Sequence, residues 1–168
     1  PFGNTAEVNN MQNKLNRLPQ ELNLVKNLKK VLKRHHPRTV VPLGDDAFVF
    51  KSFSEKTVVA QDLLIEDVHF KRSYSNSADL GHKSLAVNLS DFAAMGAKPH
   101  FVHVSLALPN DISEDWLLSY YSGMTSLADS YQVEVVGGDL SLSPGPIMID
   151  VNVIGEVAHP ITRHGAQD

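Results

Sequence analysis

Aspartates stand at four separate places in the chain where a turn, a strand end or a helix could present them to a ligand. They are Asp45 with Asp46, Asp62, Asp91 and Asp139. Several carboxylates within a few ångströms of one another cannot all stay ionised unless cations lie between them. Hard carboxylate oxygens, in a chain without cysteine and with few candidate histidine ligands, favour Mg²⁺ or Mn²⁺ over zinc. If the four places converge in the fold, the sequence predicts a site for divalent cations.

The segment before Asp139 adds a candidate phosphate contact. Gly137 and Gly138 precede it, and we expect a turn there whose backbone can approach a phosphate closely. Magnesium takes one or two carboxylates at about 2.0–2.1 Å and completes its coordination with water and substrate phosphates. The chain has no Walker A, G-x-G-x-x-G or G-x-S-x-G motif, so a P-loop, a Rossmann site and an α/β-hydrolase are unsupported. Direct phosphoryl transfer organised by metal ions fits best.

Each of these residues also has a structural interpretation. Adjacent acids such as Asp45 and Asp46, after Gly44, are usually solvated turn formers. Asp91 alone is equally well explained as a satisfied carboxylate in a core. A histidine beside an aromatic residue, as His69 is, is more often structural than a ligand. No member of the set is specific alone.

Composition excludes several classes of partner. With 168 residues the chain is long enough for one domain, and its hydrophobic fraction of 42% is ordinary for a globular protein. A net charge of −4 without a basic patch argues against nucleic acid. No apolar run approaches the roughly 20 residues of a membrane span, and the first residues do not form a secretory signal. The lack of cysteine excludes disulfides, thiolate zinc sites and cysteine nucleophiles, and we expect a cytoplasmic protein.

A helix within 80–99 is the element that must position the acids. We expect Asp79 as its N-cap, Gly96 as its left-handed C-terminal cap, and almost no wet face between them. Ser84, Asn88 and Asp91 recur at i, i+4 and i+7 and draw one polar stripe along it.

Other segments predict the rest of an α+β protein around a mainly antiparallel or mixed sheet. A polar segment of residues 1–18, which we expect to be loosely ordered, precedes a helix that begins near residue 19 and ends before Pro37. A further helix follows Ser113 or Asp111 as N-cap. Strands are expected at 47–50, 57–64, 100–108, 133–136 and 147–157.

Five segments stand in the same order and at nearly the same spacing as in thiamine-monophosphate kinases. They are GDDA at 44–47, DLLIEDVHF at 62–70, LGHKSLAVNLSDFAAMGAKP at 80–99, VVGGD at 135–139 and RHGA at 163–166. The chain resembles this family from about Leu22 to its end. The wider superfamily includes aminoimidazole ribonucleotide synthetase, selenophosphate synthetase and the hydrogenase-maturation carbamoyl dehydratase. The lack of cysteine argues against selenophosphate synthetase, and DLLIEDVHF is more similar to the thiamine-phosphate enzyme than to the purine enzyme.

The resemblance implies the N-terminal domain of the aminoimidazole ribonucleotide synthetase-like fold and a homodimer formed through it. It implies ATP-dependent phosphorylation of thiamine monophosphate to thiamine diphosphate, with several Mg²⁺ ions and ATP as co-substrate. The implied metal ligands are Asp46, with Asp45 beside it, Asp62, Asp91 and Asp139. The resemblance matches His69 to a substrate contact. Positions that meet ATP in the family are matched by Gly138, Asp139 and Arg163.

Four positions depart from the family pattern. Ala60 and Gln61 stand where two hydroxyl residues are usual, Asp67 where Gly is usual, and Leu140 where Thr is usual. The lost hydroxyls could have bound metal or phosphate, and Asp67 adds negative charge on the substrate side. A smaller metal complement, altered substrate preference and lost activity all remain open.

The resemblance also predicts the domain organisation. Residues 19–168 correspond to the N-terminal metal- and ATP-binding, dimerisation domain, and the chain ends where the family's C-terminal domain should begin. A fragment or a stand-alone half is expected to be inactive alone, because the second domain closes the cleft. Two alternatives are a non-catalytic nucleotide- or phosphate-binding relative and a superfamily enzyme acting on another phosphorylated substrate.

Overall fold

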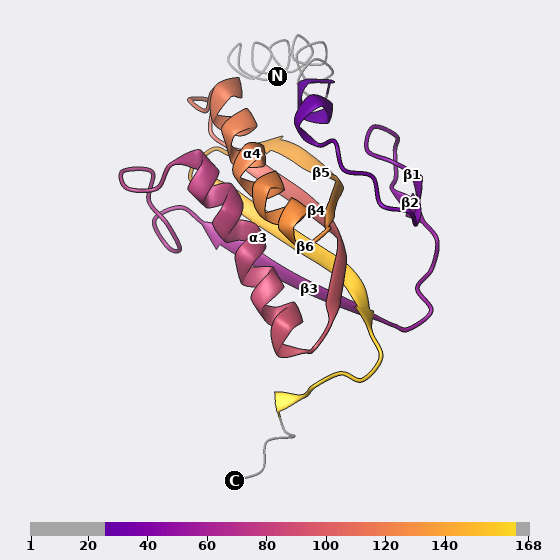
Figure 1. The fold of residues 1–168 in the computed structure, drawn as a ribbon. Coiled ribbons are helices and arrows are strands. Elements are labelled where there is room, and N and C mark those ends of the chain that lie inside the picture. The colour runs from indigo at the N-terminus through magenta and orange to yellow at the C-terminus, as the bar shows by residue number, and fades with distance from the viewer. Residues whose placement is uncertain (1–25, 164–168) are drawn as a thin grey trace, which may run out of the picture.

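The computed structural model describes residues 26–163, which build one mixed four-stranded sheet with two long helices on one face (Figure 1). The strands stand in the order β3 (Lys56–Ile65), β6 (Met148–Val157), β4 (Lys98–Leu108) and β5 (Glu134–Leu142). β6 pairs antiparallel with β3 and with β4, whereas β4 and β5 are parallel. The prediction of an α+β protein around a mainly antiparallel or mixed sheet is confirmed.

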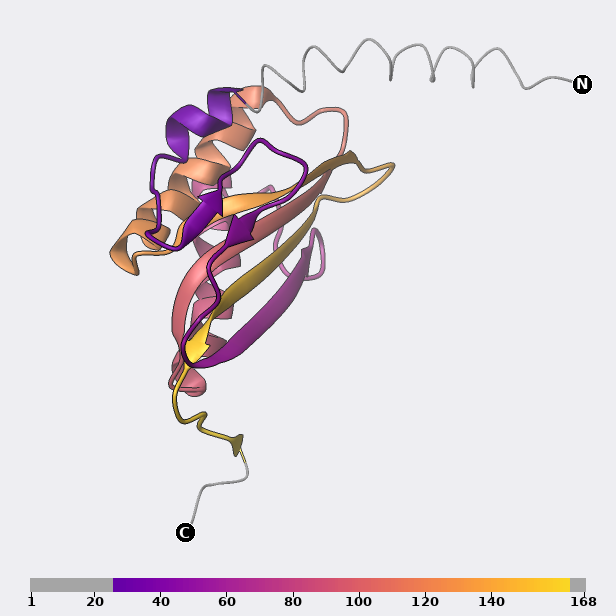
Figure 2. The ribbon, with the colours of Figure 1, turned by 90° about the vertical axis from the view of Figure 1, so that its right-hand side faces the viewer.

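The helices α3 (Ser77–Ala94) and α4 (Glu114–Ser130) lie against each other and cover the same face of the sheet (Figure 2). Their backbones approach closely at two glycines, Gly81 and Gly123, where a side chain would overlap a backbone carbonyl of the other helix. Apolar residues that alternate along the strands fill the space beneath the helices, as the period of two predicts. This core fixes α3 over β3 and β6.

The start of α3 differs from the prediction. Its N-cap is Asn76, whose side chain accepts a hydrogen bond from Asp79 N–H at 2.8 Å, so Asp79 lies inside the first turn. The C-terminal end is as predicted, with Gly96 at φ 64° after the C-cap Met95. Ser113 caps α4, accepting from Trp116 N–H, which decides between the two predicted candidates.

A short hairpin packs on the face of the sheet opposite the helices. It joins β1 (Thr39–Val41), which the sequence did not predict, to β2 (Val49–Phe50). Rings of Phe48 and Phe50 lie 4.9 Å from that of Phe101 on β4, centroid to centroid. Phe101 is fully buried, yet it lies outside the core beneath the helices. The hairpin therefore builds a second, aromatic core.

Of the predicted first helix, residues 26–31 are helical within the described part of the chain. The predicted loose order of residues 1–18 falls outside the described residues. Every helix in residues 26–163 is too short or too polar to serve as a membrane span.

Candidate functional site

Asp62 and Asp91 lie close together where β3 runs beneath α3. Asp62 is half-buried on β3, and Asp91 is exposed near the end of α3. Burial and, second, the negative charge of Asp91 raise the pKa of Asp62, while the nearby imidazole of His69 lowers it. We call Asp62, His69 and Asp91 the β3-side group.

The turn that follows β3 presents His69. Ile65 N–H donates to Nδ1 of His69 at 3.0 Å, and Phe70, only 2% exposed, fixes the turn to the core. The buried carboxylate of Glu66 accepts from Ile147 N–H at 3.0 Å and from the Arg72 guanidinium at 2.5 Å. Burial alone would raise the pKa of Glu66. The hydrogen bond from Ile147 N–H and, after it, the one from Arg72 outweigh burial and lower this pKa. The turn is therefore tied to the start of β6.

A cleft of about 890 Å³ adjoins Asp91 and contains Arg163 in its lining. The chain after β6 crosses the end of α3, where Ile161 N–H donates to the Met95 carbonyl at 3.0 Å. Most of the wall is aliphatic, from β3, α3 and Ile161. A cleft with apolar walls and one group of each charge suits a ligand with a hydrophobic part and an anionic part.

A second acidic group lies beside β5. The loop carrying Asp45 and Asp46 lines a cavity of about 250 Å³ together with Gly137 and Gly138. Both aspartates are exposed, and Asp46 N–H donates to Asp45 Oδ1 at 2.9 Å. Asp139 is also exposed and accepts from Ser141 Oγ at 2.8 Å. Asp45, Asp46, Gly138 and Asp139 form what we call the β5-side group.

The predicted turn at Gly137–Asp139 is wrong, because these residues continue β5. Gly138 is paired with Val104 and has φ 148°, and a side chain there would overlap the Val104 carbonyl. The close approach of β4 and β5 therefore requires a glycine at this position.

Polar groups hold the loop of the β5-side group to the sheet. His36 N–H and Thr39 Oγ1 donate to the buried carboxylate of Glu134 at 2.8 and 2.6 Å. The His36 and His100 rings join through Nε2 and Nδ1 at 3.1 Å, and His100 Nε2 lies 3.0 Å from Glu156 Oε1. Arg38 N–H donates to His36 Nδ1, so His36 carries its proton on Nε2 and donates it to His100 Nδ1. His100 in turn carries its proton on Nε2 and donates it to Glu156, so both rings are neutral. Burial is the main cause that lowers the pKa of both histidines.

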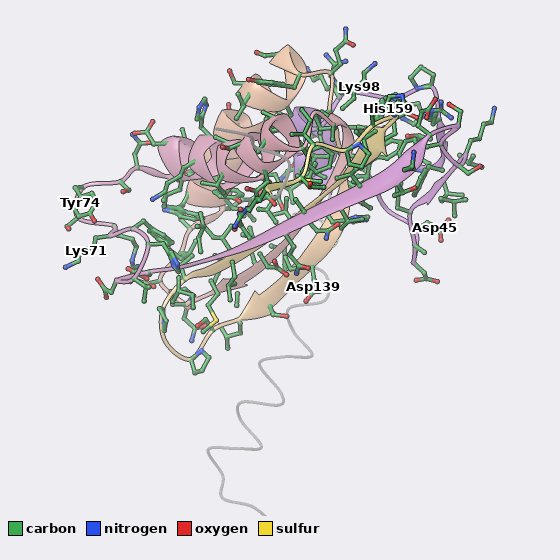
Figure 3. The ribbon with its side chains drawn as sticks, turned by 90° about the horizontal axis from the view of Figure 1, so that it is seen from below. Asp45, Lys71, Tyr74, Lys98, Asp139 and His159 are labelled. Atoms are coloured by element: carbon green, nitrogen blue, oxygen red, sulfur yellow. The ribbon has the colours of Figure 1, made fainter. Side chains whose placement is uncertain are left out.

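The two groups do not meet within one copy of the chain. β3 and β5 are the opposite edges of the sheet. Figure 3 shows Asp45 on the other side of the molecule from Lys71 and Tyr74, which belong to the loop after His69. Among residues 26–163 no three histidine or acidic side chains gather as a metal site would require. The four acidic places therefore fall into two incomplete sets.

The polar stripe on α3 ends at an exposed residue. The expectation of a helix with almost no wet face is wrong, because His82 and Lys83 near its start and Ser90 and Asp91 near its end are exposed. Ser84 and Asn88 are buried, and the Ser84 hydroxyl is 2.8 Å from that of Tyr120 on α4. Asn88 donates to the Ser84 carbonyl at 3.2 Å. Asp91 instead is exposed and lines the cleft.

Two lysines near these groups were not singled out from the sequence. Lys83 Nζ donates to the His69 carbonyl at 2.6 Å. The Lys29 ammonium lies where a side chain on residue 44 would begin, so Gly44 makes room for it. Lys29 was interpreted as part of a solvated face, and no local pattern marks either contact, since both join residues distant in sequence.

The departures from the family pattern have local explanations. Gln61 Nε2 donates to both carboxylate oxygens of Asp150, at 2.9 and 2.8 Å, on the sheet face away from α3. Asp67 has φ 65°, a conformation that favours glycine and that aspartate tolerates better than most residues. Beside Leu140, Ser141 supplies a hydroxyl to Asp139.

The fold defines an α+β protein whose mixed sheet carries acidic groups at its two edges. Residues 44–157 match the family described as AIR synthase related protein, N-terminal domain. The chain belongs to this family.

The similar proteins include several thiamine-monophosphate kinases. That of Bacillus subtilis is 42% identical over 124 residues, which are 73% of this chain and 38% of the relative. That of Aquifex aeolicus is 38% identical over 125 residues, 74% of this chain and 40% of the relative. The chain thus spans less than half the length of these relatives.

Solved structures agree in fold. Thiamine-monophosphate kinase from Stenotrophomonas maltophilia superposes with a TM-score of 0.68 at 36% identity, over 79% of this chain and 40% of that one. A structure described as AaThiL complexed with AMPPCP and TMP gives 0.64 at 35% identity, over 88% and 45%. Hydrogenase maturation protein HypE of Escherichia coli, at 15% identity and 0.61, shares the fold alone.

Proposed function

We propose that this chain is the N-terminal half of a kinase that transfers the γ-phosphoryl group of ATP to thiamine monophosphate, giving thiamine diphosphate. The observation that carries the proposal is the pairing of Asp62 with Asp91, beside His69, on elements similar to those of thiamine-monophosphate kinases. A cytoplasmic location stays a prediction.

The chemistry of the β3-side group suits magnesium. Asp62 and Asp91 offer hard oxygens. Burial and, second, the negative charge of Asp91 raise the pKa of Asp62, and a cation would relieve the repulsion between the two carboxylates. Two carboxylates suffice for an ion that keeps water and takes the remaining ligands from phosphate. Bound there, Mg²⁺ would neutralise charge on the transferring phosphoryl group. Asp45, Asp46 and Asp139 are proposed to hold further ions.

The chain's own residues would bind and orient the substrates. Arg163, in the cleft with Asp91, offers a guanidinium for ATP phosphates. His69 would contact the acceptor, and the apolar walls would shelter it from water. The transfer itself is direct, with no covalent intermediate on the protein.

The proposal includes a homodimer that completes the site. A second copy that brings its β5 edge to the β3 edge of the first would join Asp139 to Asp62 and Asp91. The sheet face away from the helices supports such a contact, because Val59 and Leu63 are 58% and 49% exposed there. A site shared in this way explains why the acids are divided within one chain.

Mixing inactive variants tests the shared site. In the protein that carries the second domain, Asp62→Asn and Asp139→Asn should each abolish transfer. Mixed dimers contain one site with both aspartates intact, so random exchange should restore about a quarter of the activity. No recovery, with exchange confirmed by mass spectrometry, would place both aspartates in one chain's site.

The activity itself is tested by incubating the two-domain protein with Mg²⁺, ATP and thiamine monophosphate and detecting the diphosphate. We expect product with both domains and none, or nearly none, with this chain alone.

A non-catalytic, nucleotide-binding relative is the second candidate. It is favoured by Gln61, whose amide is engaged with Asp150 at a position where the family pattern has a hydroxyl residue. Mg²⁺-dependent ATP binding without any product would support it.

A further inference from the structure

The imidazole of His69 is held in one tautomer by the backbone. Ile65 N–H donates to its Nδ1 at 3.0 Å, so this nitrogen is an acceptor and the neutral ring carries its proton on Nε2. The side chain is exposed. Nε2–H is therefore the group that His69 can offer to a ligand, and in this state the ring is a hydrogen-bond donor and not a base.

The backbone of His69 is held from a different element. Lys83 on α3 donates from Nζ to the His69 carbonyl at 2.6 Å, a short hydrogen bond from a charged donor. Within the turn itself, Val68 N–H and His69 N–H both donate to the Ile65 carbonyl, at 3.2 and 2.8 Å. Lys83 thus ties the turn to the helix that carries Asp91.

We propose that Lys83 is a positioning residue, which orients His69 so that Nε2–H donates to a phosphate oxygen of the acceptor substrate. This inference rests on the proposed function, because it needs a phosphorylated acceptor beside Asp62 and Asp91. A neutral donor suits this place, since it would bind an anionic oxygen without displacing a cation that the two carboxylates would hold.

The tautomer of His69 is the first readout. Long-range ¹H–¹⁵N NMR spectra of the 168-residue chain should show a single tautomer with the proton on Nε2. Lys83→Met keeps an unbranched side chain, one heavy atom shorter, but removes its charge and its donor, and it should give a mixture of the two tautomers. Lys71→Met is the matched control, because Lys71 is an exposed lysine of the adjoining loop. A single unchanged tautomer in Lys83→Met would overturn the proposal.

Kinetics of the two-domain protein give the second readout. Lys83→Met should raise KM for thiamine monophosphate about tenfold, the effect of losing one good hydrogen bond, and leave KM for ATP within about twofold. Lys83→Arg should restore most of the loss. Equal effects on both substrates together with a lower Tm would make Lys83 merely structural and overturn the proposal. An unsubstituted protein without kinase activity would overturn the proposed function alone, since the tautomer measurement does not need turnover.

Discussion

The two acidic groups are held to the same sheet by opposite means. Asp45 and Asp46 stand on a hairpin that is fastened by phenylalanines packed on Phe101 and by two neutral histidines, the half-buried His36 and the buried His100. Asp62 and Asp91 stand on long regular elements, and the turn beside them is tied by charged side chains, the buried Glu66 with Arg72 and the exposed Lys83. Packing therefore holds the β5-side group in place, whereas electrostatic interactions mainly hold the β3-side group in place. Substitutions should cost stability in the first and ligand binding in the second.

The largest effect is expected at Gly138 in the β5-side group. In Gly138→Ala the new methyl would overlap the Val104 carbonyl, and the backbone would have to leave φ 148°. We expect a loss of about 3 kcal/mol in the free energy of unfolding, measured with urea. Gly145→Ala is the control, because nothing lies within 4 Å of the added carbon, and it should be nearly neutral. Comparable stabilities would refute the packing argument.

Asp91→Asn tests the β3-side group. The substitution removes charge but little volume from an exposed residue, so the melting temperature without metal should not fall. Mg²⁺ affinity, measured by calorimetry, should drop about tenfold or more, because a ligand is lost. Asp115→Asn, an exposed acid in the first turn of α4, is the control for charge alone. A sharply lower melting temperature without metal would instead make Asp91 structural.

The sequence located Asp62 and Asp91 on the correct elements but placed Asp139 in a turn instead of on β5, and it could not predict the division of the acids into two groups. Asp62 was expected on a strand and Asp91 on a helix, and both are found there. That β3 and β5 form opposite edges depends on β6, the last strand, which inserts between β3 and β4. Such pairing joins residues far apart in the chain, and alternating hydrophobicity, which gave the strands themselves, carries no information about their order.

Protonation of His36 and His100, which are hydrogen-bonded to each other, should loosen the β5-side group and leave the β3-side group unchanged. The pKa values of His36 and His100 are lowered in the fold, so the folded state binds fewer protons than the unfolded state as the pH falls below about 6.5. Stability should therefore be complete above that pH and decline below it. A proton on His36 Nδ1 would face the Arg38 N–H donor and break this series of hydrogen bonds.

Urea unfolding between pH 7.5 and 5.0 measures this decline. The double variant His36→Gln, His100→Gln should lose the part of the pH dependence that these two histidines contribute, although it starts from a lower stability. His82→Gln alters an exposed histidine of α3 and should keep the wild-type slope. Hydrogen-exchange protection at Thr39 and Lys51, whose N–H groups donate to backbone carbonyls beside β1, should fall at low pH, relative to the intrinsic exchange rate, in the wild type and in His82→Gln but not in the double variant. Equal slopes in all three proteins would contradict the assignment.

The smallest expected effect concerns Asp67 in the β3-side turn. Its φ of 65° suits glycine, so Asp67→Gly should relieve backbone strain, although added freedom in the unfolded chain offsets part of the gain. A net stabilisation of about 0.5 kcal/mol is expected in urea unfolding. Gln132→Gly is the matched comparison, because Gln132 has φ 59° and lacks the tolerance of aspartate for this conformation, so its gain should be larger. If Asp67→Gly destabilised the protein while Gln132→Gly stabilised it, the Asp67 side chain would contribute a contact of its own, and this turn would be maintained by packing after all.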